Sequence, residues 1–220
     1  SWGVWSVMAI PFSELNKINP SSIIELFQLK LDNTLHGQNT IFYFHAGANL
    51  NNFGEIKYLQ NSYQRVAVQA EGFERKSTGT IPRPTMTFSN LGGITYTPSG
   101  AIITMSDFLQ IINLTTPNND LLGATITRLM PLASSLDTTN FTSGVNPFNS
   151  SVGSSGLADR LRDEIFVIDR KAVENRQVVQ FELTSANDLE NKRIPQRTVT
   201  KKLFPAVGTF IWWTHTLGQK

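Results

Sequence analysis

Hydrophobic residues recur along much of the chain at every second position, in short runs separated by Asn, Gly, Pro and Ser. A period of two is typical of β-strands with one buried face. Between residues 65 and 69, for example, Val66 and Val68 face one way while Arg65 and Gln69 face the other. The pattern predicts strands over 23–31, 41–45, 85–89 and 124–132, a hairpin of 55–59 with 63–69, and a hairpin of 164–170 with 177–184.

One segment follows the helical period instead. Phe108, Ile111 and Ile112 share a face, Ser106 can cap the first turn, and Asp107 suits the positive end of the helix dipole. A helix is therefore expected over 106–114. At least seven short strands with one or two short helices indicate a mainly β fold, either a barrel or a sandwich.

Composition divides the chain into an N-terminal extension (1–22), a β-rich domain (23–200) and an aromatic C-terminal segment (201–220). The segment 1–7 lacks the basic region and cleavage box of a signal peptide, and Met8 resembles a natural start, so 1–7 is interpreted as upstream translation. The stretch 143–156 is rich in Ser, Gly and Asn. It is expected to be a mobile loop, because such residues bury little apolar area to offset ordering.

Composition also excludes several classes of protein. Forty per cent hydrophobic residues with 14 Phe and 4 Trp are too apolar for a disordered chain. A net charge of +2 is too small for a surface that neutralises phosphates, so no nucleic-acid readout is expected. No run approaches the roughly 20 apolar residues that span a bilayer. The absence of Cys excludes disulfides and thiolate sites within this sequence.

The three histidines do not suggest a metal site. His36 and His45 flank an expected turn, His215 is far away in the sequence, and no third ligand has a recognisable spacing. All three are interpreted as ordinary hydrogen-bonded or exposed side chains, and no metal-binding residue is assigned.

Two pairs of acidic residues are of the type that glycosidases use as catalytic carboxylates. Asp163 and Glu164 are neighbours on an expected strand and therefore point to opposite faces, so they cannot flank one bond. They are interpreted as a solvated strand edge, and the more distant pair Glu182 and Asp188 has no better support.

Other signatures of catalysis or of ligand binding are also missing. No Gly-x-Ser-x-Gly elbow and no glycine-rich phosphate loop occurs. The aromatic run at 42–44 lacks interleaved Lys and Arg, so it indicates core packing rather than base stacking. No catalytic or cofactor-binding residue is assigned, and the chain is not expected to be an enzyme. Trp212 and Trp213 are either a cap on a core edge or an interface anchor.

Three blocks, in order, resemble the minor tail protein L family of lambda-like, long-tailed bacteriophages. The first contains an aromatic-Gln pair, Gly-Phe-Glu and Arg-Pro-Thr; the second contains Leu-Leu-Gly, Leu-Asp and Asn-Phe; the third contains Phe-Val-Ile-Asp and Ile-Pro-Gln-Arg. The first block occupies 63–74 and 79–90. The second occupies 120–128, 136–137 and 140–141. The third occupies 166–171, 179–185, 188–189 and 194–197.

The resemblance implies a structural virion protein of the tail tip or baseplate. Its expected fold is a β-barrel hub domain related in shape to tail-tube proteins, in which the Arg-Pro and Leu-Leu-Gly blocks define turns and strand starts. It would link the distal end of the tail tube to the central hub that recognises the host. The implied partners are the distal tail protein, the host-specificity hub protein and the end of the tape measure. The family further suggests a homotrimeric ring, assembled in the host bacterial cytoplasm.

The sequence departs from this family in one respect. Family members continue into a cysteine-bearing region that holds an iron–sulfur cluster, and such a cluster needs Cys thiolates. Here 207–210 reads Val-Gly-Thr-Phe, and there is no Cys in the sequence. The cluster is therefore not carried over. Either this lineage lost the region, or the sequence given ends before it or was imperfectly assigned there.

Two other functions would require different features of the sequence. A glycan-binding β-sandwich that recognises the host surface would use exposed Trp and Tyr with Asn and Asp partners, and it stays open as the alternative. A tail-associated cell-wall hydrolase needs an acid pair or a metal site, which these residues do not supply.

Overall fold

The computed structural model describes residues 22–47, 54–73, 83–96 and 98–185. All of them belong to the first of two compact units, 1–186, and the second unit is 187–220. The expected N-terminal extension up to residue 21 and the C-terminal segment lie outside the described residues. So do four singled-out side chains, Asp188, Trp212, Trp213 and His215.

The described part is mainly β, as the sequence predicts. Its strands are β1 (Leu26–Lys30), β2 (Ile41–His45), β3 (Ile56–Tyr58), β4 (Asn61–Arg65), β5 (Val68–Glu71), β6 (Thr85–Ser89), β7 (Ile94–Tyr96), β8 (Ala101–Ile103), β9 (Thr125–Leu129), β10 (Glu164–Glu174) and β11 (Val178–Ser185). The helices are α2 (Asn33–His36) and α3 (Met105–Thr115), with two 3₁₀ turns, η1 (Ala133–Ser135) and η2 (Thr138–Asn140). No described helix is long and apolar enough to span a bilayer.

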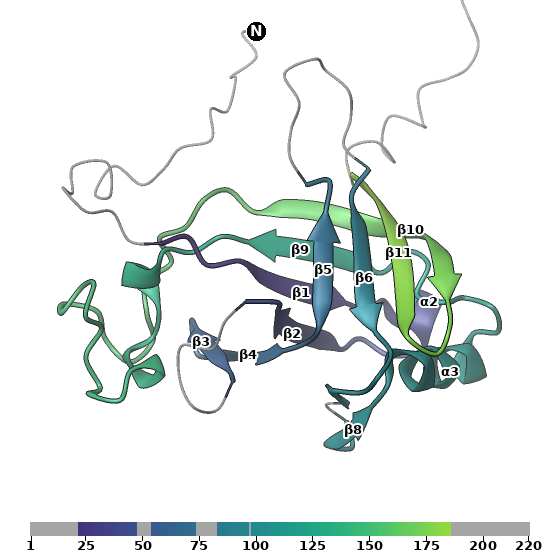
Figure 1. The fold of residues 1–220 in the computed structure, drawn as a ribbon, viewed down its shortest axis with the longest axis horizontal. Helices are drawn as coiled ribbons and strands as arrows, with labels where there is room; N and C mark the ends of the chain where they lie inside the picture. The colour runs from purple at the N-terminus through teal and green to yellow at the C-terminus, as the bar shows by residue number, and fades with distance from the viewer. Residues whose placement is uncertain (1–21, 48–53, 74–82, 97, 186–220) are drawn as a thin grey trace, which may run out of the picture. The chain divides into compact units, whose positions relative to one another are not determined.

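Nine strands form one sheet in the order β3-β4-β2-β1-β9-β10-β11-β6-β5, and β7 pairs with β8 alone. Every pairing in the large sheet is antiparallel except that of β2 with β4. In Figure 1, β1 and β9 run across the view while β5 and β6 run nearly upright in front of them. The long hairpin β10–β11 joins these two directions. Its register shifts twice, and β-bulges of this kind bend a strand.

The sheet closes on itself through the two-residue connection between β4 and β5. β4 and β5 lie near opposite ends of the strand order, yet only Val66 and Ala67 separate them in the chain. The Val66 N–H donates to the carbonyl of His45 at the end of β2 (3.0 Å), and the Ser89 N–H at the end of β6 donates to the Ala67 carbonyl (2.8 Å). Residues 61–71 therefore act as one bent strand that closes the barrel between β2 and β6.

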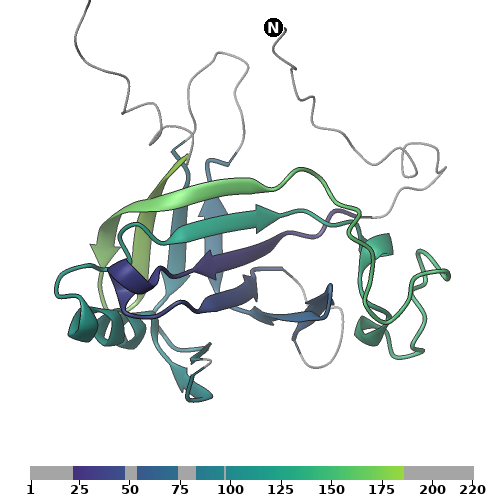
Figure 2. The ribbon, with the colours of Figure 1, turned by 180° about the vertical axis from the view of Figure 1, so that it is seen from behind.

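A ladder of phenylalanine rings fills the barrel. Phe27 on β1 stacks on Phe44 of β2 (5.5 Å between ring centroids), and Phe44 contacts Phe88 of β6 (5.6 Å). Phe88 in turn meets the ring of Phe181 on β11 at 6.0 Å. These four rings are at most 5% exposed. Figure 2 shows the same crossing of strands from behind. The ladder thus joins the two strand directions through the centre of the barrel.

Helix α3 covers the main core at the end of the barrel where α2 also lies (Figure 1). Phe108 meets Phe42 edge-on at 5.0 Å, and Leu109 and Ile112 are also buried. The expected helix is confirmed, but Ser106 is not its cap. Thr104 caps it in a reciprocal box with Asp107, because the helix starts at Met105, one residue before the expected position.

A second, smaller core lies where the β3–β4 hairpin meets β9. Its buried side chains include Leu26, Tyr58, Tyr63 and Leu136. Burial raises the pKa of Tyr63 to about 12, although Gln28 donates a hydrogen bond to its hydroxyl oxygen at 2.8 Å. Tyr63 is therefore neutral at physiological pH and serves as a packed side chain.

We predict that Gly37→Ala is more destabilising than Gly100→Ala. Both glycines have positive φ (+68° and +70°), so alanine at either site costs about 1–2 kcal/mol of backbone strain. Only at Gly37 would the new Cβ collide with Thr115, at the end of α3, and overpacking adds about 1–3 kcal/mol. Urea unfolding of the two variants measures the difference. Equal losses would contradict the tight packing of α2 against α3.

Candidate assembly surface

The described histidines are buried structural side chains rather than ligands. His36 accepts a hydrogen bond at Nδ1 from the Asp32 N–H (3.0 Å), and its Nε2–H donates to the Leu122 carbonyl (3.1 Å). His45 donates from Nε2 to the Gly54 carbonyl at 3.0 Å. Among the described residues, no three His, Cys, Asp or Glu side chains come together as metal ligands.

His45 is held neutral by its surroundings. It is fully buried, its Nδ1 has no hydrogen-bond partner, and its carbonyl belongs to the barrel closure. Burial lowers its pKa, and the nearby Arg65 acts in the same direction against the hydrogen bond to Gly54.

Acid is therefore expected to weaken the fold through His45. The unfolded chain binds a proton near pH 6.5 that the folded chain rejects, so the free energy of unfolding falls as the pH drops below about 6.5. We predict a shallower dependence of unfolding free energy on pH between about 5 and 8 for His45→Gln than for the parent chain. Identical slopes in urea-unfolding series would show that His45 does not contribute.

The acidic side chains singled out in the sequence form ion pairs with arginines. Asp163 accepts two hydrogen bonds from Arg160 (2.6 and 2.9 Å), and Glu164 pairs with Arg128 at 2.9 Å. Glu182 is bound by Arg170. The expectation of a solvated strand edge at 163–164 is wrong: Glu164 begins β10, which lies between β9 and β11, Asp163 precedes that strand, and both carboxylates form partly buried ion pairs. These pairs are structural.

The Leu-Leu-Gly block is a tight turn. Asp120 and Leu121 both adopt positive φ (50° and 65°), and Leu121 is completely buried. Lys171 of β10 pairs with Asp120 (2.9 Å), and the Gly123 N–H donates to the Ile168 carbonyl at 3.0 Å. The turn connects α3 to β9 and ties both to β10.

A polar clamp of Asp137 and Asn140 holds the β3–β4 turn. The turn residues Leu59 and Gln60 have positive φ (49° and 66°), and their N–H groups donate to the two carboxylate oxygens of Asp137 (2.8 and 2.9 Å). Asn140 accepts from the Lys57 N–H and donates to the Lys57 carbonyl, both at 2.6 Å. The clamp covers β3, which would otherwise be an open sheet edge.

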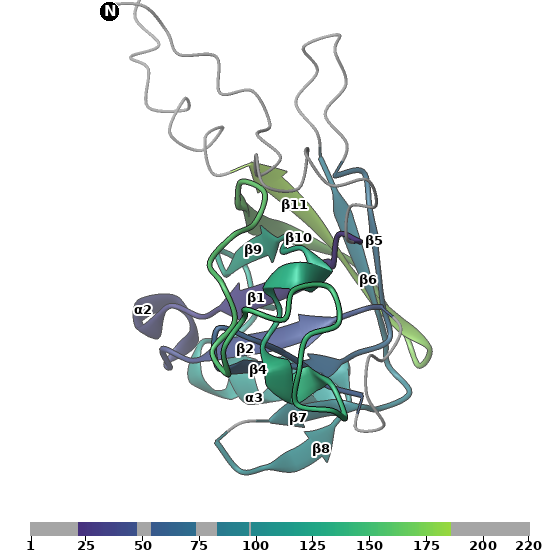
Figure 3. The same ribbon diagram turned by 90° about the vertical axis from the view of Figure 1, so that its left-hand side faces the viewer.

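The stretch 143–156 packs onto this clamp at the end of the barrel away from α3 (Figure 1), the end that faces the viewer in Figure 3. The fully buried side chain of Asn146 donates to the carbonyls of Ala133 (2.9 Å) and Leu136 (3.1 Å), and Val152 is also buried. A Cβ at Gly156 would lie only 2.5 Å from Asp137 Oδ1. Asn146 and Val152 therefore anchor to the barrel a stretch that the sequence predicts to be a mobile loop.

Several large apolar side chains are exposed on the described surface, and two features among them suit contact with a partner. One is the outer edge of β8, where Ile102 is 75% exposed. The Thr95 N–H on β7 donates to the Gln64 side chain (3.3 Å) and so points away from β8. Thr95 lies opposite Ile102 in the antiparallel pair, and two residues that face each other without exchanging hydrogen bonds both direct their backbone groups outward. The N–H and C=O of Ile102 therefore point away from β7. The other is the loop surface, where Val145, Phe148 and Leu157 are 42–50% exposed.

In the described part, then, the acidic and histidine candidates make internal contacts, while the edge of β8 and three apolar side chains of the loop surface face outward. The family model of phage minor tail protein L matches residues 34–209. The chain belongs to that family, as its ordered sequence blocks indicate, and is a structural component of a bacteriophage tail.

We predict that Asp137→Ala destabilises the chain by about 3 kcal/mol, because it leaves the N–H groups of Leu59 and Gln60 without their charged acceptor. Asp137→Asn keeps one acceptor oxygen and should lose about half as much. Asp169→Ala, on the exposed face of β10, should change stability by less than about 0.5 kcal/mol. Denaturant unfolding compares the three; an Asp137→Ala loss no larger than the control would contradict the clamp.

Proposed function

We propose that the chain is a tail-tip component that links the distal end of the tail tube to the central, host-recognising hub. Family membership supports a tail protein, and the closed barrel supports a rigid part whose shape survives mechanical load. In this proposal it forms a homotrimeric ring, and its neighbours are the distal tail protein, the hub protein and the end of the tape measure. It joins the virion during assembly in the host cytoplasm.

The β8 edge is the observation that carries this proposal. The barrel closure pairs β2 with β6 through one bent strand, and the clamp covers β3, so these strands offer little for a partner to pair with. β8 instead presents unpaired backbone groups at Ile102 beside an exposed apolar side chain. An added strand is a common way for proteins to dock on such an edge.

The remaining surface fits a static assembly. A net charge of only +2 gives little long-range repulsion between subunits packed side by side. We propose that residues 1–220 hold no thiolate-bound metal cluster, because they contain no Cys, and that Asp163, Glu164 and Glu182 serve in ion pairs rather than in catalysis. The glycan-binding alternative needs exposed Trp and Tyr side chains; the four tyrosines are buried or half-buried, and the four tryptophans lie outside the described residues.

We predict that Ile102→Lys and Ile102→Pro fold normally but fail to enter tails. Lysine adds a charge at the edge, and proline removes the N–H that a partner strand would use. Leu114→Lys, at an 84% exposed position on α3, is the matched control and should assemble normally. Complementation of phage lacking the gene, with mass spectrometry of purified tails, measures incorporation. We expect at least a tenfold loss for the two Ile102 variants only.

Antibody labelling of intact particles tests the location. Signal confined to the distal end of the tail supports the tail-tip proposal, and signal along the tail or its absence from particles overturns it. Normal assembly of both Ile102 variants, together with binding of the purified chain to host surface polysaccharide, would favour the glycan-binding alternative.

A further inference from the structure

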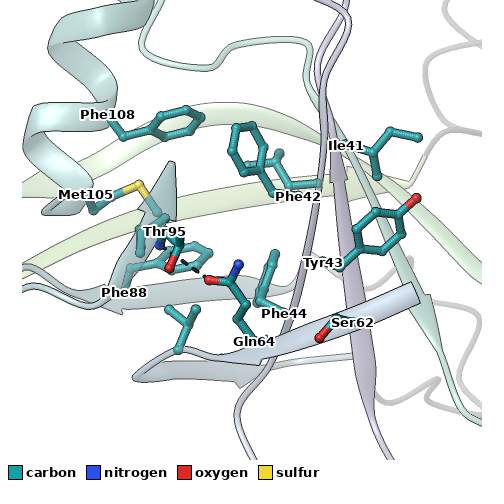
Figure 4. Close-up of a pocket in the computed structure, with 13 residues that line it drawn as sticks. Ile41, Phe42, Tyr43, Phe44, Ser62, Gln64, Phe88, Thr95, Met105 and Phe108 are labelled. Atoms are coloured by element: carbon teal, nitrogen blue, oxygen red, sulfur yellow. Dashed lines mark hydrogen bonds between the residues drawn. The ribbon is translucent and has the colours of Figure 1, made fainter. Parts of the chain in front are cut away.

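A cavity of about 180 Å³ lies between strands β2, β4 and β6, strand β7 and helix α3 (Figure 4). Its inner wall is formed by side chains that are 0–4% exposed, including Phe44, Phe88, Met105 and Phe108. The half-buried side chains of Gln64 and Thr95 lie at its polar side. The cavity is therefore deep and aromatic on one side and polar on the other.

Neighbouring contacts keep this space from collapsing. The capping box fixes the first turn of α3, and Asn90 at the end of β6 accepts a hydrogen bond from the Ser106 N–H at 2.9 Å. Gln64 accepts from the Thr95 N–H, which ties β4 to β7 across the polar side. The wall therefore consists of elements held from outside the cavity, so the side chains cannot simply move inward to fill it.

The size and the lining of the cavity determine which molecule it can hold. Protein interiors have few voids larger than a water molecule, and an apolar cavity of about 150 Å³ stays dry and binds benzene. None of the 13 lining residues is charged, and the Glu55 carboxylate, which is not in the lining, accepts a hydrogen bond from the Ser62 hydroxyl (2.7 Å), so the lining itself does not favour a buried ionic group. The phenylalanine faces and edges of the wall suit the edge-to-face contacts that aromatic rings prefer.

We propose that this cavity is a binding site for one uncharged aromatic ring of about benzene size. The inference is independent of the proposed function, because it rests on the volume and lining of the cavity alone. The ring comes either from a free small molecule or from an aromatic side chain of a neighbouring tail protein, and both sources present the same group to the same wall.

Benzene titration of the full chain, labelled at the methionine methyl groups, tests the proposal. Met105 lines the cavity, whereas the buried Met130 does not, so one spectrum contains its own control. We expect a saturable shift of the Met105 methyl signal and none at Met130. Benzoate and benzylammonium carry the same ring with a charge and should shift neither. No Met105 shift with benzene, or an equal shift with the charged analogues, overturns the proposal.

A filling variant separates binding in the cavity from binding elsewhere. Ile94→Trp places a large side chain at a lining position of β7, and Leu91→Trp adds the same side chain at an 81% exposed position that does not line the cavity. We expect at least a tenfold weaker benzene affinity for Ile94→Trp and unchanged affinity for Leu91→Trp. Unchanged affinity in both overturns the proposal. If Ile94→Trp does not fold, the benzene titration of the parent chain, read at the Met105 and Met130 methyl signals, still tests the proposal.

Thiol labelling then distinguishes the two sources of the ring. The sequence has no Cys, so Ser62→Cys introduces a single reactive group at the cavity lining. In the free chain, benzene should slow its labelling. In purified tails, slow labelling that benzene does not change indicates a neighbour's side chain in the cavity. Labelling as fast as in the free chain, and slowed by benzene, indicates a site for a free molecule. Labelling of the free chain that benzene leaves unchanged counts against the proposal.

Discussion

The barrel depends on one short connection, the two residues that join β4 to β5. Through Val66 and Ala67, the chain passes from the neighbourhood of β2 to that of β6, and two backbone hydrogen bonds close the ring of strands there. An open sheet of this length would leave β2 and β6 with unpaired edges and the phenylalanine ladder uncovered on one side. The bend at 66–67 therefore determines both the continuity of the sheet and the enclosure of its core.

Polar contacts supplement the apolar core at the two ends of the barrel. The Asp137–Asn140 clamp satisfies a hairpin turn whose residues lack glycine, and the same segment supports the loop 143–156. At the opposite end, the capping box and Asn90 fix α3 against the barrel. Both ends of the barrel are therefore held by polar contacts, and the assembly proposal rests on the β8 edge, where backbone groups and an apolar side chain face outward together.

The sequence predicted the elements better than their connections. Strands 41–45 and 85–89 are confirmed residue for residue, and the hairpin of β10 and β11 was found but is longer than expected. Local alternation reports which residues share a face, so these predictions needed no distant information. The closure, the ion pairs of Asp163 and Glu164, and the buried Asn146 depend on residues far apart in the chain. No local pattern signals them, although the Leu-Asp and Asn-Phe pairs of the second block do mark the clamp.

The strand order also has a consequence for synthesis. β1 pairs on one side with β9, which lies about 100 residues later in the chain. A ribosome adding about 5–20 residues per second needs roughly 5–20 s to make that partner. Throughout this interval, the nascent β1–β2 pair waits with an uncovered edge and exposed phenylalanines. The strand order therefore leaves this tail protein open to aggregation during its synthesis, although the finished fold covers the same edge.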